Sequence, residues 1–313
     1  MTGVSRFRPV LPLAALAVTP FLLTGCGEAE DEVQTAVGLE VQEVADIGLQ
    51  NPSSIIMDLE EDVYLVANTN GQPTQETANG FISRISPDGE VLDLEWIELS
   101  ATARPLNAPR GMALRGDTLF VADIDCIRMF NRISGEDLGF TCLDGVSFIA
   151  DIDVGDEGSL FVADAGLRWE DGAMQPTGTD AVYRVVLEEG RRGSTLAQSD
   201  ELGNPSGIAV STRGIFVTAP GTGELFALSP DGSRTNILPP SDRELTGLTF
   251  LTDGSFVFSS VSGESLTMVD AGGQIMELAT GVPDAQGLAY DAARHRILVA
   301  IPSENRLLFM DLP

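Results

Sequence analysis

The residues of this sequence best suited to chemistry are polar side chains at the start of short apolar segments. Arg110, Asp151 and Gln286 are examples, and each lies directly before or within such a segment. Arginine holds anions through charge-assisted hydrogen bonds, and a carboxylate binds cations or moves protons. These positions predict one ligand site, whose candidate members are Asn51, Ser53, Arg110, Asp151, Asn204, Ser206, Thr246 and Gln286.

Familiar catalytic motifs are missing from the sequence. The single histidine, His295, lies in the turn "DAARHR". This turn joins two strands of the last repeat, so it should lie on the face away from the candidate site. A Ser-His-Asp site or a histidine general base is therefore not expected there. No Gly-rich phosphate loop, HExxH or CxxC motif occurs. The sequence thus identifies no catalytic residues.

Arg110 stands where the other repeats carry smaller side chains. It begins the first strand of the second repeat, in "APRGMAL". Three interpretations remain open: the guanidinium holds an anionic or carboxylate ligand, pairs with Asp151, or pairs with Asp123.

A pattern that recurs six times must position these residues. Each copy is a short apolar strand, a polar turn with Gly or Asp, and a strand of β-branched and aromatic residues, as in "NPSGIAVSTRGIFVTAP". The copies start at Asn51, Ala108, Phe148, Asn204, Leu245 and Ala285, a base period near 40 residues. Such a period with four strands per unit predicts an all-β, six-bladed β-propeller.

The sixth repeat ends after its third strand, "RLLFMDL". We expect the segment Val37–Gly48 to supply the missing outer strand and so close the ring, because closure removes an open sheet edge. The predicted organisation is a signal segment over residues 1–25, a lipidated cysteine with an acidic tether over 26–36, and the propeller over 37–313.

Two insertions lengthen the first and third repeats. Asn68–Gly80 and Asp164–Asp180 each follow a second strand, so both should lie over the end of the channel where the first strands begin. Long loops on a rigid scaffold commonly carry function. Arg168 and Trp169, in the second insertion, are candidates for a stacking lid or for a rim that packs on itself.

The N-terminus predicts export. Arg6 and Arg8 precede an apolar stretch with three prolines, followed by "LTGC" at Leu23–Cys26. Together these features indicate a secretory signal, and "LTGC" resembles the bacterial lipobox, which implies a lipidated Cys26 as the mature N-terminus. We expect a protein of the bacterial cell envelope, on the periplasmic side or the surface and most simply at the outer membrane.

The charge balance restricts the partners. All 18 basic residues are arginine, and they face 47 acids, a formal net charge of −29. Removal of the signal segment loses two arginines and no acids, which makes the charge −31. Nucleic acid and anionic membrane surfaces are therefore excluded as ligands, and the membrane is contacted only through the lipid.

Cys126 and Cys142 are predicted to form a disulfide. A hairpin folded about Ser134 places the two cysteines opposite each other, where Cβ atoms are about 4.5–5.5 Å apart. An exported protein permits the bond. Two unpaired thiols are the alternative.

The repeats "NPSGIAV…IFVTAP" and "APRGMAL…LFVADID" resemble NHL-repeat propellers and the senescence-marker-protein/gluconolactonase family, over nearly all of residues 37–313. The resemblance implies the fold rather than one activity, because that superfamily contains lactonases, ester hydrolases, a condensing enzyme and binding modules. It also implies that Asp123 and Asp164, which both end "FVAD", bond turn backbone instead of a ligand.

The same resemblance implies a channel cation, usually calcium, held by Glu, Asn and Asp side chains. Of four family ligand positions only one keeps its carboxylate, Asp151; the others meet "NPSS", Pro205-Ser206-Gly207 and Leu245-Thr246-Gly247. Asn51, Asn204 and Asp153 would be new ligands. Calcium or another divalent cation is thus an open expectation with no confident cofactor.

Two functions follow. The first is a monomeric protein that binds a sugar- or lactone-like small molecule at the channel mouth, with or without weak lactone or ester hydrolysis. The second is a non-enzymatic scaffold that binds a protein or envelope polymer with the same face.

Overall fold

The computed structural model describes residues 33–36, 38–100, 102, 104–155, 158–187 and 192–313. The expected signal segment and Cys26 lie outside these residues. Over the described part of the chain, no helix has the length and apolar character needed to cross a membrane.

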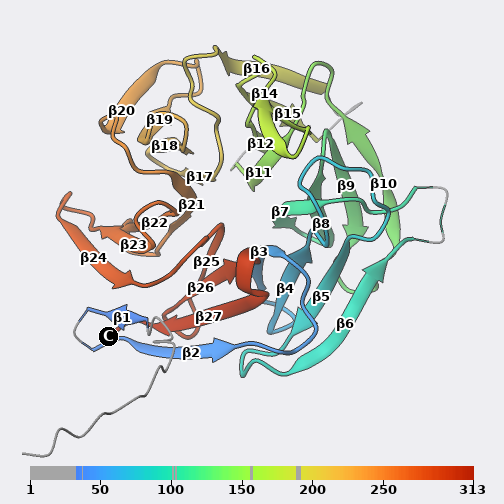
Figure 1. The fold of residues 1–313 in the computed structure, drawn as a ribbon, viewed down its shortest axis with the longest axis horizontal. Helices are drawn as coiled ribbons and strands as arrows, with labels where there is room; N and C mark the ends of the chain where they lie inside the picture. Colours follow the sequence, from blue (N-terminus) through green and yellow to red (C-terminus); the bar gives the residue numbers. More distant parts are fainter. Residues whose placement is uncertain (1–32, 37, 101, 103, 156–157, 188–191) are drawn as a thin grey trace, which may run out of the picture. The chain divides into compact units, whose positions relative to one another are not determined.

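Six four-stranded antiparallel sheets follow one another around a central channel, as Figure 1 shows. Blade one contains β3 (Pro52–Asp58), β4 (Val63–Asn68), β5 (Phe81–Ile85) and β6 (Val91–Glu98), and blade two contains β7 (Pro109–Arg115), β8 (Thr118–Asp123), β9 (Cys126–Asn131) and β10 (Asp137–Cys142). Blade three contains β11 (Ile149–Val154), β12 (Ser159–Asp164), β15 (Ala181–Val186) and β16 (Arg192–Gln198), and blade four contains β17 (Ile208–Ser211), β18 (Gly214–Ala219), β19 (Glu224–Leu228) and β20 (Arg234–Leu238). Blade five contains β21 (Leu245–Phe250), β22 (Phe256–Ser260), β23 (Ser265–Val269) and β24 (Ile275–Thr280), and blade six contains β25 (Gly287–Asp291), β26 (Arg296–Ile301), β27 (Arg306–Asp311) and β2 (Glu40–Val44). The predicted six-bladed propeller is confirmed.

The N-terminal segment closes the ring as predicted. β2 pairs antiparallel with β27, from Glu40 opposite Asp311 to Val44 opposite Leu307. One further strand, β1 (Gln34–Thr35), pairs with β24 of the neighbouring blade. The folded unit therefore begins at Val33, within the segment expected to be a tether, and the N-terminal segment contacts two blades.

Burial explains why the second strands are rich in apolar residues. Every residue of β4, β12 and β22 is buried, because both faces of a blade pack against neighbouring blades. Leu65 and Ala67 of blade one, for example, share a core cluster with Leu119 and Val121 of blade two. Outer strands such as β10 and β20 alternate or are exposed.

The first strands of adjacent blades approach closely around the channel. A Cβ atom on Gly207 would lie 2.2 Å from the backbone oxygen of Thr246 in the next blade, and a Cβ on Gly247 would lie 2.6 Å from that of Gln286. Glycine is required at these positions because any side chain would push the blades apart.

The hairpin of β9 and β10 brings the cysteines together. Cys142 lies directly opposite Cys126, and the two sulfurs form a disulfide. A β-bulge between Asp137 and Gly139 inserts one extra residue after the turn. Next to the turn, the pairing is therefore one residue away from the register predicted about Ser134. The bulge restores the predicted register at the cysteines.

Candidate functional site

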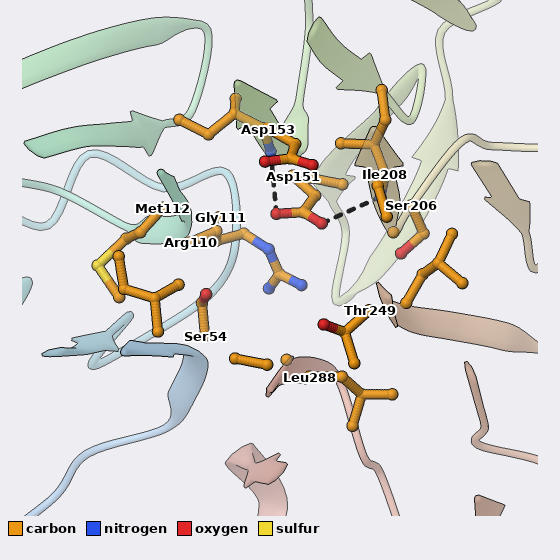
Figure 2. Close-up of a pocket in the computed structure, with 18 of the residues that line it drawn as sticks. Ser54, Arg110, Gly111, Met112, Asp151, Asp153, Ser206, Ile208, Thr249 and Leu288 are labelled. Carbon is orange, nitrogen blue, oxygen red and sulfur yellow. Dashed lines mark hydrogen bonds between the residues drawn. The ribbon is translucent and has the colours of Figure 1, made fainter. Parts of the chain in front are cut away.

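The first strands of all six blades surround a cavity of about 280 Å³, the channel cavity (Figure 2). Its polar lining includes Ser53, Arg110, Asp151, Ser206 and Gln286 from the predicted set. A second cavity of about 290 Å³, the mouth cavity, adjoins it at Ser53, Arg110 and Gln286. The channel therefore has room for a small molecule, although it is at the small end of known ligand pockets.

Arg110 is the centre of the channel cavity. Its Nη2 donates a hydrogen bond to Oε1 of Gln286 across the channel at 2.6 Å, and the guanidinium lies 5.1 Å above the ring centre of Phe148. No carboxylate of the described residues lies within ion-pair distance, so Arg110 pairs with neither Asp151 nor Asp123. Burial lowers the pKa of Arg110 to about 10, which leaves the side chain protonated at neutral pH.

Asp151 and Asp153 bridge the strands of blades three and four. Asp151 accepts the N–H of Ile152 at 2.9 Å and that of Ile208 at 3.0 Å. Asp153 accepts the N–H of Val154 and that of Val210, both at 2.7 Å. The carboxylates thus satisfy N–H groups on the inner edge of β17, which would otherwise face the channel without a partner.

Burial raises the pKa of both bridging carboxyls. The pKa of Asp151 reaches about 7, against the opposing effect of the two N–H donors, and neighbouring Asp153 adds to the rise. The pKa of Asp153 reaches about 6 for the same reason. Asp151 is therefore half protonated near neutral pH, and the protonated form can donate a hydrogen bond into the cavity.

Three predicted site residues serve the blade junctions instead of lining the channel cavity. Asn51 donates its backbone N–H to Asn305 and its side-chain amide to Pro302, although it still borders the mouth cavity. Asn204 donates to Ala165 and Asp180. The remaining one, Thr246, is buried and donates to the backbone oxygen of Ala285.

Sequence reasoning missed two hydroxyls that line the channel cavity. Ser54 and Thr249 point into it in Figure 2, and neither hydroxyl bonds to another described residue. Ser54 occupies the repeat position of Gly111, Asp151 and Gly207, so alignment of the repeats could have singled it out. Thr249 lies within an apolar strand and carries no such signal.

The two insertions meet above the channel. The second forms a hairpin of β13 (Leu167–Glu170) and β14 (Ala173–Pro176), and the backbone N–H of Trp169 donates to Oγ1 of Thr74 in the first insertion at 2.7 Å. Leu167 and Met174 pack against a small apolar cluster that includes Phe148, whose ring contacts the Arg110 guanidinium. Arg168 is exposed and faces Glu170 at 3.8 Å. Trp169 thus joins the rim, whereas Arg168 points to solvent.

Asp123 and Asp164 have structural roles, as predicted. Asp123 accepts the N–H groups of Asn107 and Ala108. Asp164 is fully buried and accepts the N–H groups of Phe148 and Gly166, both at 3.0 Å. Both carboxylates fix the loops that lead into the first strands.

The channel residues do not fit a calcium ion. Calcium takes six to eight oxygen ligands, typically with several carboxylates. Here both oxygens of Asp151 and of Asp153 already accept backbone N–H groups, and the charged Arg110 lies in the same cavity. Among the described residues, the only cluster of three possible metal ligands contains the disulfide cysteines.

Comparison with known proteins identifies the fold. No family model and no curated protein matches the sequence. Among solved structures, a gluconolactonase from Xanthomonas campestris is similar to the chain with a TM-score of 0.65, 19% identity and coverage of 89% of this chain and 91% of that one. Virginiamycin B lyase from Staphylococcus aureus is similar with a TM-score of 0.61, 14% identity and coverage of 88% of this chain and 100% of that one. A chain of a nidogen/laminin complex is similar with a TM-score of 0.57, 18% identity and coverage of 76% of this chain and 84% of that one. At these identities the likeness shows a shared propeller fold.

Proposed function

We propose that this protein binds a small molecule in the channel cavity. The observation that carries the proposal is an open cavity of about 280 Å³ with a charged Arg110 that has no carboxylate of the described residues within ion-pair distance. A scaffold would instead be expected to plug its channel with side chains. Because a gluconolactonase shares the fold, sugars, lactones and their acids belong among the small molecules to test.

Binding fits the cavity better than turnover. Asp151, the carboxyl whose pKa reaches about 7, accepts one backbone N–H on each oxygen, and these donors lower its basicity. Each oxygen keeps a lone pair, but no histidine lines the cavity to form a catalytic pair with it. Any lactone or ester hydrolysis should therefore be weak and should not depend on calcium.

The test is a thermal-shift screen of sugars, lactones and small acids, followed by calorimetry of the hits. A specific ligand at 100 times its Kd stabilises the fold by about 2.7 kcal/mol. Leu288→Trp, which adds bulk at the cavity wall, should abolish the shift. Leu92→Trp, on the exposed outer strand of blade one, is the matched control and should leave it unchanged. Hits that bind both variants equally would place the site elsewhere.

The scaffold alternative, expected on the same face as the cavity, is favoured by an observation on a different surface. Leu92, Leu138 and Phe140 are exposed on the outer strands of blades one and two, and a propeller in a nidogen/laminin complex shares the fold. A contact surface would need these side chains to form one contiguous apolar patch. The alternative would gain support if the cavity screen found no ligand.

We also propose that the protein is exported and anchored through a lipid on Cys26. The basic and apolar N-terminus with "LTGC" supports this, as does a disulfide in the folded unit. Cys26→Ser should shift the protein from the membrane fraction to the soluble fraction and abolish incorporation of labelled palmitate. Retention of Cys26→Ser in membranes would argue against a lipid anchor.

A further inference from the structure

The channel cavity offers more donors than acceptors to a ligand. Of the Arg110 nitrogens, only Nη2 has a hydrogen-bond partner; Nη1 has none among the described residues, and Nε is buried without one. A buried donor without a partner costs free energy that a ligand acceptor would recover. The guanidinium is therefore built to receive an additional acceptor.

Hydroxyl groups surround the same position. Ser54 of blade one, Ser206 of blade four and Thr249 of blade five point into the cavity in Figure 2, and none of these hydroxyls bonds to another described residue. One guanidinium with several free hydroxyls matches an oxyanion, whose oxygens accept from each of them.

The acids nearest Arg110 attract its charge from beyond ion-pair distance: Asp151 in the channel cavity and Asp284 at the mouth cavity both raise its pKa. The carboxylates of Asp151 and Asp153 hold backbone N–H groups, and Asp284 accepts Nε2 of Gln286 and the N–H of Ser303. Protonation of Asp151 near neutral pH further reduces the negative charge that an anion would meet. With these acids nearby, the single guanidinium suits a ligand with no more than one negative charge.

The cavity becomes apolar further along the strands. Ile56, Val210, Phe250 and Leu288 line it and are only half-buried by the protein. Ile56 lies three residues beyond Ser53 on the same strand, roughly 10 Å along the channel at about 3.3 Å per residue. A ligand held at Arg110 can therefore place an apolar body against these side chains.

We propose that the ligand is a small monocarboxylate with a short apolar body, its carboxylate at Arg110 and the hydroxyls of Ser54, Ser206 and Thr249. This inference rests on the proposed function, since it names the ligand class of the same cavity. It separates the expected ligand from neutral sugars and lactones, which would leave the arginine charge unpaired.

The test compares matched ligands by calorimetry at pH 6.5. Phenylacetate and octanoate should bind, and the neutral analogue phenylacetamide should bind roughly 10- to 100-fold more weakly, since it lacks the charge-assisted hydrogen bonds. Gluconate and inorganic phosphate report whether a polar carboxylate or another oxyanion suffices, and glucono-δ-lactone represents the neutral class.

Variants locate the site. Arg110→Met should weaken phenylacetate binding roughly 10- to 100-fold, Arg110→Lys should weaken it less, and Thr249→Val should weaken it a few-fold. Arg168→Met, at the exposed rim arginine, should leave it unchanged. Thr249→Val and Arg110→Lys keep the proposal testable if Arg110→Met fails to fold.

The outcomes separate the two proposals. Equal binding of phenylacetate and phenylacetamide, or unchanged affinity in Arg110→Met, would overturn the carboxylate assignment. Binding of gluconate, phosphate or the lactone without phenylacetate would also overturn it and leave small-molecule binding standing. Failure of these probes and of the whole cavity screen would overturn both.

Discussion

A chain that begins at Leu49, and so lacks β2, is expected to lose its cooperative thermal unfolding transition or to unfold at a much lower temperature. β2 pairs with β27 over five residues, and Val44 packs with Leu307 and Phe309 in the core. Its removal exposes that core and leaves β27 as an open edge. One buried valine and the lost strand pairs amount to at least about 3 kcal/mol of unfolding free energy.

The matched control is a chain that begins at Gly38, which keeps β2 and loses β1, the half-buried Val33 and the hydrogen bond from the Ala36 N–H to Leu278. It should unfold only slightly below the chain from Val33, since these contacts lie at the outer edge of blade five. Differential scanning calorimetry of the three chains measures this order. A synthetic peptide of residues 38–48 should partly restore the shortest chain. Equal midpoints for the chains from Gly38 and Leu49 would show that β2 does not close the ring.

The second large effect is a decline of stability between pH 5 and pH 8. The folded pKa of Asp151 is about 7 and that of Asp153 about 6, both above the value of 3.8 for an unfolded chain. The folded state therefore binds more protons than the unfolded state in this window. Their stabilising effect is fully present below pH ~4 and is lost as pH rises through the folded values. Asp151 alone should contribute a loss of about 3 kcal/mol from pH 5 to pH 8.

Asp151→Asn should remove most of this pH dependence, because the amide does not titrate. Denaturant unfolding at several pH values measures it. Asp153→Asn should remove a smaller part, confined to lower pH, and Asp88→Asn, on an exposed hairpin turn, is the matched control. The carboxylates with lowered pKa, such as Asp311 beside Arg296, lose their stabilising effect only below pH ~4. A full decline that persists in Asp151→Asn would exclude this carboxyl as its source.

The propeller could be predicted from the sequence because its signals are local and repeated. The alternation of strand residues occurs six times, Asp-Gly turns such as Asp88-Gly89 separate strands, and three of the five steps between repeats are 40 or 41 residues, so errors in one repeat are corrected by the others. Closure by the N-terminal strand could be predicted from the number of strands in each repeat, since the sixth repeat has one strand fewer than the others. β1 could not be predicted in this way, because two residues carry no periodicity.

The disulfide shows how register depends on backbone detail. The count about Ser134 pairs the cysteines correctly, yet the hairpin next to the turn is in a different register until the bulge between Asp137 and Gly139. A hairpin with the bulge and a hairpin without it have the same pattern of residues, because bulges depend on local twist and strand pairing.

For the candidate site, the repeats indicate which residues begin the first strands and hence which ring they form. Which of these residues face the channel depends on how the blades pack. Asn204 and Thr246 turn to their blade junctions, whereas Ser54 and Thr249 turn into the cavity. Arg110 bonds to Gln286, 176 residues away, and to no acid within ion-pair distance among the described residues. Such choices depend on the spacing between blades, which neighbouring backbones set and which no local pattern of residues encodes.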